Sequence, residues 1–86
     1  MDIGRRVAAA RALQRKTQQQ LANDLTRISG EEWTRNDVAG IENGRRSMKA
    51  GDLPHFAAAQ DQGFSWYLGN DLPSTGTGGY LQLAIA

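Results

Sequence analysis

All ten lysine and arginine residues of the chain lie between Arg5 and Lys49, so the positive charge is concentrated in the first half. Residues 1–49 carry ten basic and six acidic side chains, a net charge of +4, whereas residues 50–86 carry three aspartates and no basic residue, a net charge of −3. Clustered guanidinium and ammonium groups are suited to binding phosphates. The pattern predicts a polyanionic partner for the first half, with an ordinary solvated surface as the alternative.

The residue types that carry catalysis or bind metals are absent or isolated. The four serines have no histidine and carboxylate at a readable spacing, and the glycines lack the context of a phosphate-binding loop. There is no cysteine, and the single histidine, His55, has no second histidine to form a metal-binding pair. We therefore expect no enzymatic activity, no metal and no cofactor. We expect His55 to lie on a helix surface or in a core with its hydrogen bonds satisfied.

The length of the chain and its apolar segments bear on domain size and on cellular location. At 86 residues it suffices for one small domain, in which most large apolar side chains must be structural. The first residues lack the apolar run of a signal peptide, and no stretch approaches the roughly 20 apolar residues that span a membrane. We expect a cytoplasmic protein without a membrane partner.

Capping residues and helical spacing predict two helices before residue 30. Asp2 can cap the first helix. Thr17 begins the second, with Gln20 at the three-residue spacing of a capping box, and this helix ends before Gly30. The apolar side chains expected to be buried are Ile3, Val7 and Ala10 in the first helix, and Leu21, Ala22, Leu25 and Ile28 in the second.

A third short helix follows the same rules. Thr34 and Asp37 form a second capping pair, Val38 and Ile41 face inward, and Gly44 ends the helix. Just before it, Trp33 is expected to pack into the core rather than to serve as a platform for a ligand.

The second half predicts two further helical segments. A fourth helix is expected over residues 50–62, with Pro54 in its first turn and Gly63 closing it. A final short turn should seal the core. The side chains expected to face inward are Leu53, Phe56, Ala57 and Gln60 in the fourth helix, and Phe64, Trp66 and Leu68 in the final turn.

The end of the chain differs in character. Residues 71–79 have the composition of a linker, and in residues 80–86 Leu81, Leu83 and Ile85 alternate with smaller or polar residues as in a β-strand. A lone strand needs an edge to pair with. It is expected either to pair with a second chain as a dimerisation element or to dock within its own chain.

Two segments in this order, Thr17-Gln18-Gln19-Gln20-Leu21-Ala22 and Val38-Ala39-Gly40-Ile41-Glu42-Asn43-Gly44-Arg45-Arg46, resemble the Cro and lambda-repressor-like (xenobiotic-response-element type) helix-turn-helix family. The resemblance covers about residues 2–70 and implies a compact, all-α, five-helix DNA-binding domain over residues 1–70. The chain departs from the family in two places. The connection from Thr26 to Trp33 holds about six additional residues, and residues 60–63 are polar where an apolar residue is usual.

The resemblance assigns base reading to the third helix. Arg35 can bridge guanine O6 and N7, and Asn36 can bridge adenine N6 and N7. Ala39 would contact a thymine methyl group, and Gly40 would let the helix approach closely, although helix packing explains Gly40 equally well. Gln18 would contact a phosphate or a base edge at the start of the second helix, with a merely solvated side chain as the alternative.

Phosphate contacts and one structural ion pair complete the expected site. The residues expected to hold phosphates are Lys16, Thr17, Thr34, Asn43, Arg45 and Arg46, with Arg5, Arg6 and Arg15 as a second basic margin. Such contacts position a protein on DNA without specifying sequence. The resemblance also implies an ion pair between Arg11 and Glu42 that joins the first and third helices.

Together these features predict a small Cro-like repressor of phage or bacterial type, binding double-stranded DNA at a palindromic operator as a homodimer. The alternative, from a different class, is an antitoxin or accessory protein-interaction module. Its helix-turn-helix would serve as a scaffold, and its tail would bind a protein partner.

Overall fold

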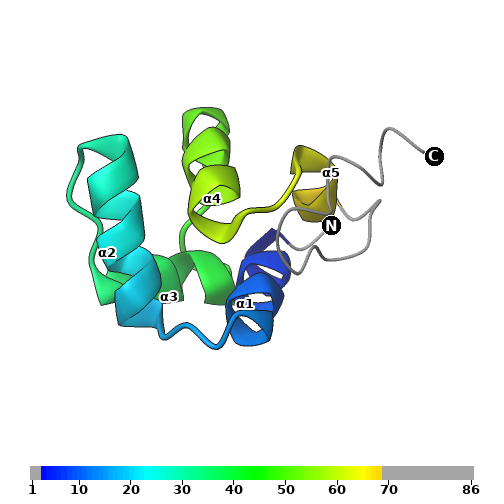
Figure 1. The fold of residues 1–86 in the computed structure, drawn as a ribbon, viewed down its shortest axis with the longest axis horizontal. Coiled ribbons are helices and arrows are strands. Elements are labelled where there is room, and N and C mark those ends of the chain that lie inside the picture. Colours follow the sequence, from blue (N-terminus) through cyan, green and yellow to red (C-terminus); the bar gives the residue numbers. More distant parts are fainter. Residues whose placement is uncertain (1–2, 69–86) are drawn as a thin grey trace.

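The computed structural model describes residues 3–68, which fold into a compact all-α domain (Figure 1). The elements are α1 (Ile3–Leu13), α2 (Gln18–Ser29), α3 (Arg35–Asn43), the 3-10 turn η1 (Ala50–Asp52), α4 (Leu53–Gln60) and α5 (Phe64–Tyr67). Five helices and no strand occur in this range, which confirms the predicted compact all-α architecture. The expected cap Asp2, the linker and the strand-like tail with Leu81, Leu83 and Ile85 lie outside the described residues.

None of the helices between residues 3 and 68 has both the length and the apolar character needed to cross a membrane.

Both predicted capping boxes form. Thr17 Oγ1 accepts from the Gln20 backbone N–H at 3.0 Å, and Gln20 Oε1 accepts from the Thr17 N–H at 2.8 Å. Thr34 Oγ1 accepts from the Asp37 N–H at 3.2 Å, and Asp37 Oδ2 accepts from the Thr34 N–H at 2.9 Å. Each box satisfies backbone donors that a helix start would otherwise leave unpaired, so both helices begin where the sequence predicts.

The connection between α2 and α3 is shorter than the expected Thr26–Trp33 segment. The helix continues through Ser29 and ends at Gly30, whose φ of 76° is the left-handed conformation that glycine adopts readily. Residues 30–34 alone therefore join the helices. Thr26 Oγ1 accepts from the Trp33 N–H at 2.8 Å and donates to the Ala22 carbonyl at 3.0 Å, which ties the connection to the last turns of α2.

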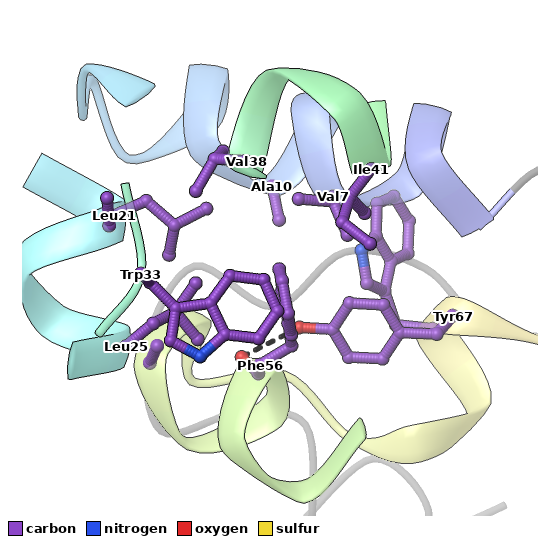
Figure 2. Packing of buried hydrophobic residues seen from close by; sticks show 12 residues of the cluster. Val7, Ala10, Leu21, Leu25, Trp33, Val38, Ile41, Phe56 and Tyr67 are labelled. Carbon is purple, nitrogen blue, oxygen red and sulfur yellow. Dashed lines mark hydrogen bonds between the residues drawn. The ribbon is translucent and has the colours of Figure 1, made fainter. Parts of the chain in front are cut away.

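The core lies between the helices and is centred on aromatic contacts (Figure 2). The Trp33 and Phe56 rings meet edge to face, with centroids 5.3 Å apart, so the prediction that Trp33 packs inward is confirmed. The other buried apolar side chains are Val7, Ala10, Leu21, Ala22, Leu25, Val38, Ile41, Ala59, Trp66 and Tyr67.

The fourth predicted helix is divided and shorter than expected. The turn η1 precedes α4, Pro54 lies in the first turn of α4, and the helix ends at Gln60 rather than at residue 62. Asp61 ends it in the left-handed conformation, with φ of 52°. Gly63 instead precedes α5 as its capping residue.

The final turn buries a different set of residues from the predicted one. Trp66 is buried as predicted, but Phe64 and Leu68 are 53% and 44% exposed, so their predicted inward positions are wrong. The neighbouring Tyr67 is buried instead. Phe64 and Leu68 are four residues apart and share one helical face, whereas Trp66 lies on the opposite side of the turn and Tyr67 beside them, turned into the core.

A buried polar side chain links three helices. Gln60 is 1% exposed, as its predicted inward position requires. Its Nε2 donates to the Val7 carbonyl of α1 at 2.9 Å, and its Oε1 accepts from the Tyr67 hydroxyl of α5 at 2.8 Å. The amide is thus satisfied inside the core, which explains how a polar side chain can be fully buried there.

Candidate nucleic-acid interface

The exposed side of α3 carries the residues expected to read bases. This helix packs against both α1 and α2 (Figure 1), with Val38 and Ile41 turned into the core. Arg35 and Asn36 are exposed in its first turn, and Ala39 is half-buried one turn later. The structure therefore leaves the Arg35 and Asn36 side chains free of any role in the core.

Gly40 does not belong to this exposed side. It is buried, and a Cβ built on it would lie 3.4 Å from Cβ of Arg46, whose backbone N–H donates to the Gly40 carbonyl at 3.0 Å. Of the two explanations offered for Gly40, its burial favours packing of the chain that follows α3 over close approach of a duplex.

A polar cleft runs between α2, the connection and the start of α3. The residues lining it are Gln19, Asn23, Thr26, Glu32, Trp33, Thr34 and Arg35. Within it, Gln19 Nε2 donates to Asn23 Oδ1 at 2.9 Å. Gln19, Asn23 and Glu32 were not among the site residues predicted from the sequence. The signal for the first two was the spacing of two carboxamides, four residues apart, on a helix face without apolar residues.

Two arginines flank the exposed side of α3 without a carboxylate partner among residues 3–68. For Arg35 the described residues hold no side-chain hydrogen bond or ion pair, and Arg45 Nε donates only to the neutral Asn43 Oδ1, at 3.2 Å. Asn43 Oδ1 also accepts from the Arg45 backbone N–H at 3.0 Å, which orders the turn after α3. Both guanidinium groups are exposed and can bind an anion.

Lys16 is engaged within the protein. Its Nζ lies 2.7 Å from Asp24 Oδ2 and 3.4 Å from the Ala59 carbonyl. The Lys16 hydrogen bond is the main cause that holds the pKa of Asp24 below its usual value. A phosphate would have to compete with Asp24 for this ammonium group.

Arg46 is also held by the protein. Its guanidinium lies 3.0 Å from Asp37 Oδ1 and stacks over the Trp33 ring at 4.5 Å from the centroid. The pKa of Asp37 is lowered chiefly by the hydrogen bond from the Thr34 backbone, with Arg46 adding to it. Lys16 and Arg46 are therefore placed to stabilise the fold, and their expected phosphate contacts would be weakened by these carboxylates.

The expected ion pair joins α1 to α3. Arg11 Nε and Nη2 donate to the two carboxylate oxygens of Glu42 at 2.7 and 3.0 Å, and the side chains are 22% and 8% exposed. This bond raises the pKa of Arg11. Gln18 Nε2 also donates to Glu42, at 3.0 Å. Gln18 is thus part of this network, and only its remaining amide hydrogen and carbonyl oxygen can meet DNA.

The remaining basic and titratable candidates belong to α1, to the link that follows it and to α4. The Arg6 guanidinium stacks on the Trp66 ring, 4.5 Å from its centroid, and Arg15 is exposed in the link between α1 and α2. Arg5 is exposed on α1. His55 is half-buried on α4, and its Nδ1 has no hydrogen-bond partner, so the expectation of a satisfied core histidine is not met. No group of three potential metal ligands occurs in the part of the chain that the structure describes.

Comparisons of the chain with protein-family models, with curated proteins and with solved structures found no match.

Proposed function

We propose that this chain is a sequence-specific DNA-binding transcriptional regulator of the Cro and lambda-repressor-like helix-turn-helix class, in which α2 and α3 form the motif. The observation that carries the proposal is the exposed first turn of α3. Arg35 and Asn36 stand there without any role in the core, on a helix that two neighbours and a capping box hold in place. Such a helix start is the part of a recognition helix that reaches base edges in the major groove.

The chemistry around that turn supports the same function. Arg35 would donate to guanine and Asn36 would bridge adenine, while Ala39 would pack on a thymine methyl group. Arg45 would hold a phosphate at the other end of α3. At the start of α2, backbone N–H groups that lack a helical partner would meet a second phosphate, beside Thr17.

Three variants test this proposal. Arg35→Ala should relax base preference by about tenfold or more at one position of the site, because a paired Arg–guanine contact is lost. Arg35→Lys keeps the charge and should relax it as well, because lysine lacks the planar fork. Arg45→Ala should weaken binding to all sequences alike.

The measurements are selection of bound sites from random duplexes and anisotropy titrations of the full chain at one fixed salt concentration. Failure of the full chain to bind any duplex at low salt would contradict the proposal.

A protein contact at the α5 end is favoured by the exposed Phe64 and Leu68. In the proposed regulator this contact joins two copies of the chain into a homodimer, which binds a palindromic operator. Residues 80–86 are an additional pairing element between the two copies. Deletion of residues 72–86 should shift the protein from dimer towards monomer in solution and should lower the operator affinity. A chain that stays monomeric, does not bind duplexes and instead captures a protein through this end would favour the second candidate, an antitoxin or accessory interaction module.

A further inference from the structure

The cleft beside α3 combines a hydrogen-bond acceptor with a hydrogen-bond donor. Glu32 and Arg35 both line it, with Trp33 and Thr34 between them in sequence. An ionised carboxylate only accepts hydrogen bonds, and a guanidinium only donates them. These are the two groups needed to read a G·C pair from the major groove, where cytosine presents its N4 amine and guanine presents O6 and N7.

Neither side chain is used by the fold. Glu32 and Arg35 are both exposed, and no ion pair joins them to each other or to any other residue in the range 3–68. The backbone on which Glu32 stands is nevertheless fixed. Its neighbour Trp33 is buried, and the Trp33 N–H is bonded to Thr26 Oγ1 of α2 at 2.8 Å. A carboxylate on a fixed backbone beside the first turn of α3 is placed for directional recognition.

The neighbouring Glu31 has the same charge but a different position. It is exposed, and the cleft lining includes Glu32 but not Glu31. Its backbone N–H is bonded to the Ser29 hydroxyl at 3.1 Å, in the turn that ends α2. Comparing a substitution of Glu31 with one of Glu32 therefore separates the general repulsion of phosphates from the recognition of a base.

We infer that Glu32 is a specificity-determining residue, which accepts a hydrogen bond from the N4 amine of a cytosine while Arg35 contacts a guanine in the same half of the site. The inference rests on the proposed DNA-binding function. The carboxylate weakens binding to duplexes in general, because it repels phosphates, and it compensates for this only where a cytosine is present. The connection between α2 and α3 therefore contributes to sequence reading and does not merely join the two helices.

The test compares Glu32→Ala with Glu31→Ala in the full chain. Each change removes one negative charge, so both variants should bind duplexes of unrelated sequence more tightly than the original chain does. Glu32→Ala removes both acceptor oxygens and should lose, by about tenfold, the preference for cytosine at one position of each half-site, whereas Glu31→Ala should retain it. Glu32→Asp keeps the charge but shortens the side chain, and should also lose the preference. The readouts are site selection from random duplexes, titrations at fixed salt, and helix content by circular dichroism as a control for folding.

Two results would overturn the inference in distinguishable ways. If the original chain binds selected duplexes and Glu32→Ala, still helical, keeps the same base preferences, Glu32 is not a reader although the proposed function stands. If the original chain binds no duplex at low salt, the proposed function and this inference fail together.

Discussion

Glu42 is the residue through which α3 is held in position. Its two carboxylate oxygens receive donors from Arg11 of α1 and Gln18 of α2, while the residue itself belongs to α3. The exposed turn with Arg35 is therefore positioned by a polar contact some two turns further along the same helix. In the proposed complex Glu42 acts on DNA binding only through the orientation of α3.

Removal of the Glu42 carboxylate should destabilise the domain strongly. Glu42→Ala leaves the partly buried Arg11 guanidinium without its partner, and we expect the free energy of unfolding to fall by about 3 kcal/mol. Glu42→Gln, which keeps one acceptor oxygen, should lose less. Urea denaturation followed by circular dichroism measures both, and equal stability of Glu42→Ala and the original chain would show that the pair has no structural role.

Asp37 should make the stability depend on acid. Its pKa in the folded state lies below the ordinary value of 3.8, mainly because of the Thr34 backbone hydrogen bond. A carboxylate with a lowered folded-state pKa stabilises the fold above the unfolded-state pKa, and this contribution is lost as the pH falls through the folded-state value. Asp24 behaves in the same way.

We expect the free energy of unfolding to decrease as the pH is lowered below about 3.8, and to decrease less steeply in Asp37→Asn. Asparagine can still accept from Thr34, so the variant separates the charge from the cap. Denaturant titrations at several pH values measure the slope, and identical slopes for the variant and the original chain would contradict the assignment.

At the scale of the helices, α1 and α3 are packed more closely than their sequences suggest. A Cβ built on Gly4 of α1 would overlap the Ile41 carbonyl oxygen and lie 2.8 Å from the Glu42 carbonyl oxygen, both in α3. The absence of a side chain at Gly4 is what allows this approach. The contact places α1 against the C-terminal half of the proposed recognition helix.

Gly4→Ala should therefore push the two helices apart. We expect a loss of about 2 kcal/mol of stability, despite the better helix propensity of alanine. Gly51→Ala is the matched control, since a Cβ there meets nothing within 4 Å and should change stability little. Thermal and urea unfolding of both variants compare them, and a neutral Gly4→Ala would show that the helices can separate at little cost.

The sequence predicts the bounds of α2 and α3 better than the extent of the fourth helix or the buried faces. Thr17 and Thr34 mark the starts of α2 and α3 because a capping box is local chemistry, readable from residues three apart, and Gly30 and Gly44 mark their ends. The end of α4 was not readable, because Asp61, rather than a glycine, adopts the left-handed conformation there. The face of α5 was misjudged, since four residues carry too little periodicity to show which side is buried.

The candidate site was predictable to a similar extent. The positions of Arg35 and Asn36 on an exposed turn follow from the cap and the apolar spacing. The engagement of Lys16 and Arg46 by aspartates, and the cleft beside Glu32, result from tertiary contacts that no local pattern contains. The burial of Gly40 was not readable for the same reason, because Arg46, which packs against it, comes from beyond the helix end.

For the molecule as a whole, Gln60 is the polar centre of the core. It joins α1 and α5 to α4 through the Val7 carbonyl and the Tyr67 hydroxyl. The same hydroxyl contacts the Phe56 carbonyl at 3.0 Å, and burial raises the pKa of Tyr67. The short α5 is held to the rest of the domain by this network and by the buried Trp66.

Gln60→Met should show how much this network contributes to the free energy of unfolding. Methionine fills a similar volume but can neither donate to the Val7 carbonyl nor accept from the Tyr67 hydroxyl, and we expect a loss of about 2 kcal/mol of stability. Tyr67→Phe removes a hydroxyl but leaves Gln60 bonded to Val7, so it should cost about 1 kcal/mol. Denaturant unfolding compares the variants, and a smaller loss for Gln60→Met than for Tyr67→Phe would contradict the central role of Gln60.

The ion pairs of Lys16 with Asp24 and of Arg46 with Asp37 bear on how the proposed regulator would search a genome. A cation that already has a carboxylate partner displaces few counterions from DNA, so Arg35 and Arg45 would account for a release of about two counterions per domain. Attraction to unrelated sequence would then be weak, and it would depend only slightly on salt. Such a protein would slide over short distances, dissociate often and reach its site mainly by repeated encounters from solution.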